Sequence, residues 1–165
     1  MPCETLFGPA SGLFDFTVFN AVVHEHDTPP GGLPRNIIRT DQDWSVHVNW
    51  TVDGMLTGMI AGFWDLHVAL ESIGPGPELD LTDPGDHVIP LVTGGGGGPV
   101  NYTSEVNIAA GVVPALPHHG SELYIVGVSM TYREVLPGGL IGPPGPLACH
   151  SVERTVQFYN PGPPP

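Results

Sequence analysis

Residues 43–53 alternate between apolar and polar side chains, and this stretch limits the folds open to the chain more than any other. Its apolar residues are Trp44, Val46, Val48, Trp50 and Val52. Between them stand Ser45, His47, Asn49 and Thr51. Successive side chains of a strand point to opposite faces, so the stretch predicts a β-strand with one buried and one solvent-facing side. Two buried tryptophans need a second layer to cover them, and we therefore expect two packed sheets.

The same alternation recurs at 63–72 and 121–134, and shorter apolar runs predict strands at 13–26, 36–40, 87–92, 100–110 and 149–159. We expect strand 63–72 to lie beside strand 43–53 as its antiparallel neighbour. In segment 13–26, period two places one set of side chains on a common face: Phe14, Phe16, Val18, Val22, His24 and His26. The expected core between the sheets contains Trp44, Trp50, Trp64, Tyr124, Val126, Val128 and Phe158.

The chain has 23 glycines and 20 prolines, and they cluster between the apolar runs, which is typical of turns and loops. Residues 53–62 and 137–146 are both expected to be loops. The pattern predicts an all-β fold, a single antiparallel β-sandwich of about six to eight strands, with a jelly roll as the alternative. Residues 1–12 form an expected N-terminal arm, 13–159 the sandwich, and 160–165 a proline-rich tail.

Two features resemble immunoglobulin-like and fibronectin-type-III-like sandwiches at the level of the fold. Tryptophans lie on an early predicted strand. A late predicted strand has the pattern G-x-x-x-Y-x-V, formed by Gly120, Tyr124 and Val126. The resemblance implies a sandwich in which Tyr124 makes a tyrosine-corner hydrogen bond. The Cys…Trp…Cys pattern of immunoglobulin domains is absent. Proteins with this fold have many different functions, so the resemblance does not indicate a function for this chain.

The net charge of −13 disfavours several classes of partner. The only basic residues are Arg35, Arg39, Arg133 and Arg154, whereas nucleic acids and anionic membranes are bound by clustered Lys and Arg. No apolar run is long enough to span a bilayer. No signal peptide is visible, so we expect a cytoplasmic protein or one exported by a signal-independent route. Cys3 and Cys149 are expected to be reduced thiols, and the alternative is a bridge between them that closes a loop of nearly the whole chain.

Histidines provide the candidate transition-metal ligands. His24 and His26 lie two residues apart, a spacing that metal sites use, and His118 and His119 are candidates to complete a zinc shell. The spacing resembles the HxH of cupins, but the glutamate that cupins place a few residues later is missing. We therefore expect no tightly bound metal and no cofactor.

An acidic loop provides candidate calcium ligands: Asp80, Asp83 and Asp86, with Glu78 nearby. Their spacing is not that of an EF-hand, and Pro84 interrupts the loop, so a solvated acidic loop is the simpler interpretation. The nearest approach to a G-x-S-x-G nucleophile motif, at residues 127–131, lacks the second glycine.

No catalytic pattern stands out, and the sequence favours a non-enzymatic structural or protein-interaction sandwich, a subunit or decoration of a larger assembly. The expected partners are proteins, including further copies of the chain. The expected contact residues are Leu6 and Phe7 on the N-terminal arm and four residues of the 53–62 loop: Met55, Leu56, Met59 and Ile60. The alternatives are a small metal-binding protein or metal-dependent enzyme built on His24 and His26, and a sandwich that binds sugars or peptides.

Overall fold

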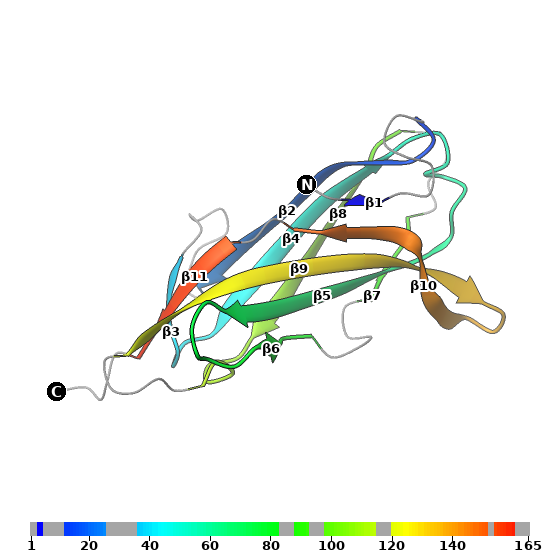
Figure 1. Ribbon diagram of the computed structural model, residues 1–165. Helices are drawn as coiled ribbons and strands as arrows, with labels where there is room; N and C mark the ends of the chain where they lie inside the picture. The colour runs from blue at the N-terminus through cyan, green and yellow to red at the C-terminus, as the bar shows by residue number, and fades with distance from the viewer. Residues whose placement is uncertain are drawn as a thin grey trace.

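A computed structural model shows an all-β chain in two sheets (Figure 1). It describes residues 3–4, 12–25, 36–82, 88–92, 98–114, 120–151 and 154–160. In these residues the strands are β1 (Cys3–Glu4), β2 (Asp15–Glu25), β3 (Ile37–Arg39), β4 (Trp44–Asp53), β5 (Gly62–Ser72), β6 (Leu79–Asp80), β7 (Val88–Pro90), β8 (Val100–Ile108), β9 (Ser121–Leu136), β10 (Leu140–His150) and β11 (Arg154–Tyr159). The prediction of an all-β sandwich is confirmed.

The small sheet has the strand order β2–β4–β8 and is antiparallel throughout. Its central strand, β4, is the strand that the alternation at 43–53 predicts. Along β4 the apolar residues are buried, while Asn49 on the opposite face is exposed. The small sheet therefore presents one apolar face to the large sheet and one polar face to solvent.

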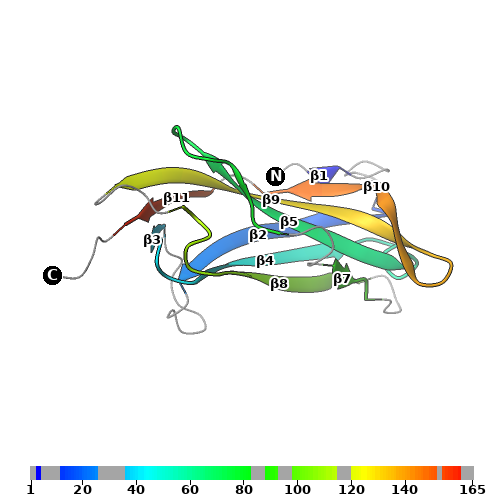
Figure 2. The ribbon, with the colours of Figure 1, turned by 90° about the horizontal axis from the view of Figure 1, so that it is seen from below.

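The large sheet is organised around the 16-residue strand β9 (Figure 2). One edge of β9 pairs with β5, and the other edge pairs first with β11 and then with β10. The short strands β6 and β7 extend the sheet beyond β5, and β1 extends it beyond β10. The pairing of β3 with β11 is parallel, so the sandwich is not purely antiparallel as predicted.

Strand β5 is not the neighbour of β4, and the predicted pairing of these two strands is wrong. In the large sheet β5 pairs with β6, β7 and β9, whereas β4 pairs with β2 and β8 in the small sheet. The connecting residues, 54–61, carry the chain from one sheet to the other. Both strands have the alternation of a half-buried strand, and that pattern does not reveal which partner lies beside each strand.

A β-bulge in β2 changes which residues face the core. Phe16 lies opposite Val52, but Val18 lies opposite Thr51, so the alternation shifts between them. Beyond the bulge Phe19 and Val23 are buried, and Val22 and His24 lie on the other face. The predicted common face, with Phe14, Phe16, Val18, Val22, His24 and His26, is therefore wrong after Phe16; His26 itself lies outside the described residues.

Strand β10 includes residues 140–146, which the sequence predicts as part of a Pro/Gly loop. It pairs with β9, and its register shifts between Ile141 and Pro144 and again between Pro144 and Ala148. Proline lacks the N–H that a regular ladder needs, and irregular pairing accommodates it. The β9–β10 turn is closed by a hydrogen bond of 3.0 Å from Gly139 N to Leu136 O, and Gly138 and Gly139 have φ values of 87° and 79°. Glycine is favoured at such positive φ.

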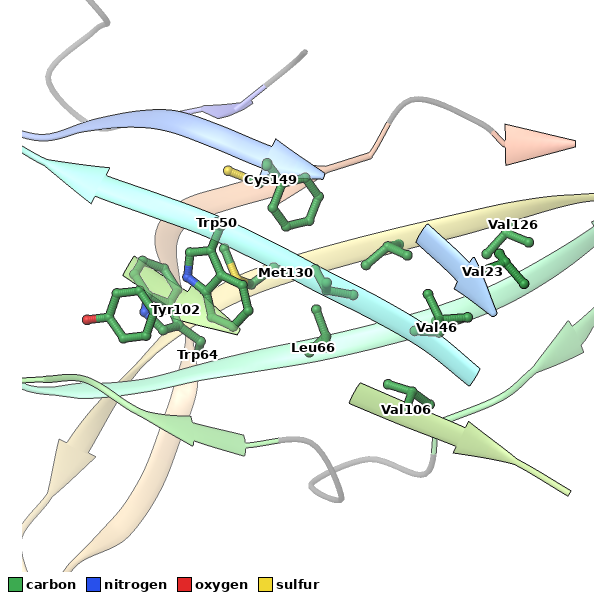
Figure 3. Packing of buried hydrophobic residues seen from close by; sticks show 14 of the residues in the cluster. Val23, Val46, Trp50, Trp64, Leu66, Tyr102, Val106, Val126, Met130 and Cys149 are labelled. Carbon is green, nitrogen blue, oxygen red and sulfur yellow. The ribbon is translucent and has the colours of Figure 1, made fainter. Parts of the chain in front are cut away.

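The core between the sheets contains every residue predicted for it. Figure 3 shows Trp50, Trp64 and Val126 among its members. Trp50 from the small sheet stacks on Tyr102 with ring centroids 5.2 Å apart. Trp64 from the large sheet meets Tyr102 edge-on at 6.1 Å, so the aromatic rings join the two layers. The exposed fractions are Trp44 3%, Trp50 1%, Trp64 0%, Tyr124 0%, Val126 2%, Val128 1% and Phe158 0%.

The prediction of reduced cysteines is wrong, because Cys149 is disulfide-bonded. Cys3 is the only other cysteine of the chain, and its backbone lies directly opposite that of Cys149 in the β1–β10 pair. Opposed residues of an antiparallel pair have the Cα separation that a disulfide requires. The sequence places Cys3 on a breaker-rich arm, and nothing in its composition predicts that the arm pairs with β10.

Candidate functional site

One end of the sandwich carries a concentration of exposed apolar side chains, which we call the hairpin end. Its members are Met55, Met59, Val92, Val135, Leu136, Leu140 and Ile141. They come from three segments: the β4–β5 loop, the residues after β7 and the β9–β10 hairpin. Gly62 pairs with Glu134, and Leu91 N donates to Gly62 O at 2.9 Å, so the three segments meet at one end of the molecule (Figures 1 and 2).

The β9–β10 hairpin projects beyond the rest of the large sheet. Pairing of β5 with β9 stops at Glu134, and β9 continues to Leu136 with only β10 beside it. Leu140 lies opposite Leu136, and Ile141 lies opposite Val135, so each face of the ribbon carries one apolar pair. Leu140 is 66% exposed. A two-stranded ribbon has no second layer to cover such pairs, which leaves both faces open for contact.

The β4–β5 loop divides the four apolar residues predicted to make contacts. Met55 and Met59 are 71% and 78% exposed. Leu56 is half-buried, and Ile60 is half-buried and packs against the core. Hydrogen bonds from Met55 N to Gly12 O and from Leu56 N to Leu13 O fix the loop, which decides which side chains turn outward. Leu6 and Phe7, the predicted contacts of the arm, lie outside the described residues.

Sequence reasoning missed the hairpin itself as a contact surface. In the run Val135–Leu136–Pro137–Gly138–Gly139–Leu140–Ile141, residues 137–141 belong to the predicted loop 137–146. It nevertheless contains a turn signal, Pro-Gly-Gly, between two pairs of β-forming residues. Such a signal predicts a hairpin, and it would have placed the exposed apolar pairs at its tip.

A second apolar surface, which we call the stripe end, lies on the outer face of the large sheet at the start of β9. Ile37 lies opposite Gln157, Gln157 lies opposite Leu123, and Ile73 N donates to Leu123 O at 2.9 Å. Ile37, Ile73 and Leu123 are 56%, 53% and 45% exposed. A shallow pocket of about 580 Å³ opens here, and its walls include Ile73, Pro75 and Leu123.

A groove of about 820 Å³ crosses the middle of the outer face of the large sheet. Small residues form its floor, among them Ala69, Gly127 and Ser129, and acidic residues at its rim include Glu71 and Glu78. His67 lies directly opposite Ser129 in the β5–β9 pair and lines the groove.

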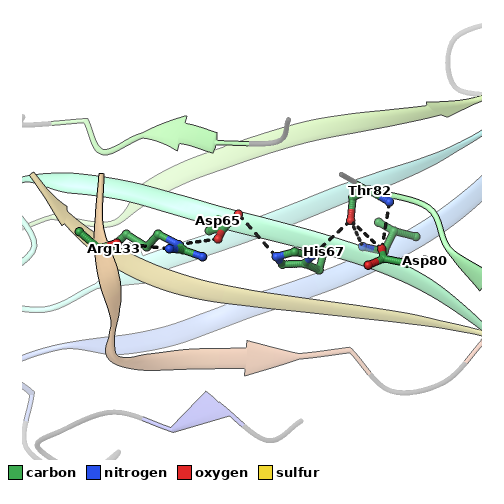
Figure 4. Close-up of polar contacts among 7 residues, drawn as sticks. Asp65, His67, Asp80, Thr82 and Arg133 are labelled. Atoms are coloured by element: carbon green, nitrogen blue, oxygen red, sulfur yellow. Dashed lines mark hydrogen bonds and ion pairs between the residues drawn. The ribbon is translucent and has the colours of Figure 1, made fainter. Parts of the chain in front are cut away.

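A chain of polar contacts holds His67 at this groove (Figure 4). Asp65 Oδ1 lies 3.7 Å from His67 Nε2, and Thr82 Oγ1 lies 3.4 Å from His67 Nδ1. Arg133 Nε donates to Asp65 Oδ2 at 2.5 Å. The order carboxylate, imidazole, hydroxyl is that of a nucleophilic triad. However, Thr82 is only 3% exposed and its hydroxyl accepts a hydrogen bond from Val68 N, so this hydroxyl is not placed to attack a substrate in the groove.

The predicted metal ligands are only partly within the described residues. His24 lies on the outer face of the small sheet, and its ring centroid is 4.7 Å from that of His47, whose Nε2 lies 2.9 Å from Glu105 Oε1. Burial lowers the pKa of His24 below its ordinary value of 6.5, and the nearby His47 lowers this pKa further. Among the residues that the structure describes, no group of three or more potential ligands could hold a metal ion.

Most of the remaining predicted ligands lie where the structure is not described. His26, His118 and His119 lie outside the described residues, as do Asp83 and Asp86 of the predicted calcium loop. Asp80 is described, and its carboxylate accepts a hydrogen bond from Thr82 N at 3.2 Å, so it caps the turn after β6.

Comparison with known proteins identifies no relative: no protein-family model, no curated protein and no solved structure matches this chain. Nor do the described residues include a helix with the length and apolar character needed to cross a membrane.

Proposed function

We propose that the protein is a non-enzymatic β-sandwich that works as a subunit of a larger assembly and binds a protein partner through its hairpin end. The single observation that carries this proposal is the group of exposed apolar residues at that end. Met59 and Leu140 are 78% and 66% exposed on two different segments that meet there. Exposed apolar residues gathered at one end of a molecule are typical of a binding site, because an isolated chain gains nothing by leaving them in water.

The charge of the chain supports a protein as the partner. At a net charge of −13, nucleic acids and anionic membranes are repelled. The segment 135–143 of the hairpin end contains no charged residue. An apolar contact area within an acidic surface favours a specific partner over random association, because the charge opposes every contact that does not bury the apolar residues.

The disulfide of Cys149 supports an oxidising compartment as the place where the protein works. Disulfides persist outside the reducing cytosol. Of the two locations expected from the sequence, this observation favours export over the cytoplasm.

Leu140→Asp is expected to release the protein from its assembly in the source cells. The added carboxylate would have to be buried without a partner in the contact, which is costly. We expect the wild-type chain to elute from a native extract well above its mass of 17.4 kDa, and the variant to elute as a free chain. Size-exclusion chromatography with antibody detection measures both.

Ser129→Asp is the matched control, because it adds the same charge at an exposed position in the groove of the large sheet. We expect it to elute with the wild type. A wild-type chain that elutes as a monomer would refute the proposal, and so would a complex that survives Leu140→Asp. Loss of the complex in Ser129→Asp alone would assign the contact to the groove instead.

A further inference from the structure

The exposed large apolar side chains of the described residues fall into two groups, one at each end of the sandwich. Seven belong to the hairpin end, and the others are Ile37, Ile73, Val112 and Leu123. Val112 follows β8, whose last residue, Ile108, lies opposite Trp44 at the start of β4. Trp44 in turn contacts Phe158, which lies opposite Glu122 of β9, so Val112 lies at the same end of the sandwich as Leu123.

Strand β9 connects the two ends. It begins with Ser121 and Leu123 at the stripe end and finishes with Val135 and Leu136 at the hairpin end. At about 3.3 Å per residue, its 16 residues separate the two surfaces by about 50 Å. Figure 1 shows β9 running along the whole length of the molecule. The two apolar surfaces therefore lie at opposite ends of the molecule and cannot cover each other within one chain.

The two surfaces are compatible in shape. The hairpin end projects as a narrow ribbon with Leu140 and Ile141 near its tip, and the stripe end is hollowed into the pocket of about 580 Å³. The pocket is walled by apolar side chains that the ribbon can bury, among them Ile73 and Leu123. In a contact between two hairpin ends, by contrast, neither projecting ribbon would have a pocket to enter.

The two surfaces are also compatible in charge. Among the described residues that line the pocket, Glu122 is the one that carries a charge. Its carboxylate accepts hydrogen bonds from Ser72 Oγ at 3.1 Å and from Tyr124 OH at 3.3 Å; the latter bond replaces the backbone contact expected of a tyrosine corner. Docking the uncharged ribbon there places no second carboxylate next to that of Glu122. Side-by-side contact between two copies, by contrast, would bring their acidic outer faces together.

We propose that the partner bound at the hairpin end is a second copy of this chain, whose stripe end receives the hairpin. This inference rests on the proposed function and names its partner. The contact is heterologous, because different surfaces of the two copies meet, and the pair then has a free hairpin at one end and a free pocket at the other. Repetition of the contact generates a ring or an open filament.

Two variants with complementary defects test this arrangement. Leu140→Asp removes the hairpin contact and keeps the pocket, while Leu123→Asp removes the pocket contact and keeps the hairpin. Multi-angle light scattering should show that the average mass of the purified wild type increases with protein concentration. Each variant alone should be monomeric, with a dissociation constant raised at least about tenfold. An equimolar mixture should form a dimer of twice 17.4 kDa and grow no further.

Circular dichroism confirms that each variant is folded, and Ile73→Asp replaces Leu123→Asp if the latter does not fold. A monomeric wild type at every concentration overturns the inference, as does a mixture of folded variants that stays monomeric. Self-association of Leu123→Asp alone, at wild-type strength, would indicate a hairpin-to-hairpin dimer and also overturn it. If the wild type is monomeric when pure but its complex in extracts is still lost in Leu140→Asp, the proposed function stands and the partner is another protein.

Discussion

Replacing Trp50 with alanine is expected to lower the free energy of unfolding by about 3–5 kcal/mol, the range for truncating a buried aromatic side chain. Trp50 is 1% exposed and stacks on Tyr102 at an interplanar angle of 7°. Its indole Nε1 has no hydrogen-bond partner in the described part of the chain, so we attribute the loss to burial and stacking. Urea unfolding followed by circular dichroism measures the change.

Trp50→Phe is the control for this substitution, because it keeps an aromatic ring against Tyr102 and removes less volume. We expect it to cost clearly less than Trp50→Ala. A loss below about 1 kcal/mol for the alanine variant, the size of a typical surface effect, would mean that Trp50 is not part of the core between the sheets.

Arg133→Met is expected to lower the free energy of unfolding by a similar amount, about 3–5 kcal/mol, because it leaves a buried carboxylate without its partner. Asp65 is 2% exposed, and Arg133 Nε is 2.5 Å from its Oδ2. Within the described residues Asp65 Oδ1 has no hydrogen-bond partner, and its nearest counter-group there is His67 Nε2 at 3.7 Å, too far to replace the hydrogen bond from Arg133. Urea unfolding at neutral pH measures the loss.

The chain offers a matched control, Arg39→Met. Arg39 also binds an aspartate, Asp41, at 2.7 Å, but both side chains are about half exposed, at 46% and 53%. Water and salt screen such a pair, and its loss should leave stability almost unchanged. Equal losses for Arg133→Met and Arg39→Met would contradict the burial of Asp65.

The core could be predicted from the sequence because it depends only on alternation. In β4, β5 and β9 every second residue is large and apolar, and period two assigns these residues to one face whichever strands lie beside them. Trp44, Trp50, Trp64 and Tyr124 were therefore placed correctly. The choice of partner strands could not be predicted, because β4 and β5 have the same pattern and lie in different sheets.

The errors in the predicted fold have local physical causes. One extra residue between Phe16 and Val18 reverses the faces of β2, and sequence alternation alone does not detect a bulge. Proline and glycine in 140–146 predict a loop, but β10 keeps its pairing with β9 by shifting register at Pro144. The disulfide of Cys149 depends on where the N-terminal arm lies, which composition does not determine.

The candidate contact surface was predicted in part. Its two methionines, Met55 and Met59, belong to a segment that the sequence identifies as apolar and rich in glycine. The two methionines are exposed whereas Leu56 and Ile60 are half-buried. This difference depends on backbone hydrogen bonds to Gly12 and Leu13, which lie far away in the sequence. The β9–β10 hairpin was missed because its turn residues were interpreted only as breakers.

Contact between copies through apolar ends is tested most directly by the mass of the purified wild-type chain as salt is raised. Raising NaCl from about 0.01 M to about 1 M shortens the Debye length from about 30 Å to about 3 Å. Salt thus screens the repulsion between copies of net charge −13 and leaves the apolar contact intact. We predict that the average mass from light scattering rises with salt at fixed concentration. A mass of 17.4 kDa at every salt and protein concentration would contradict it.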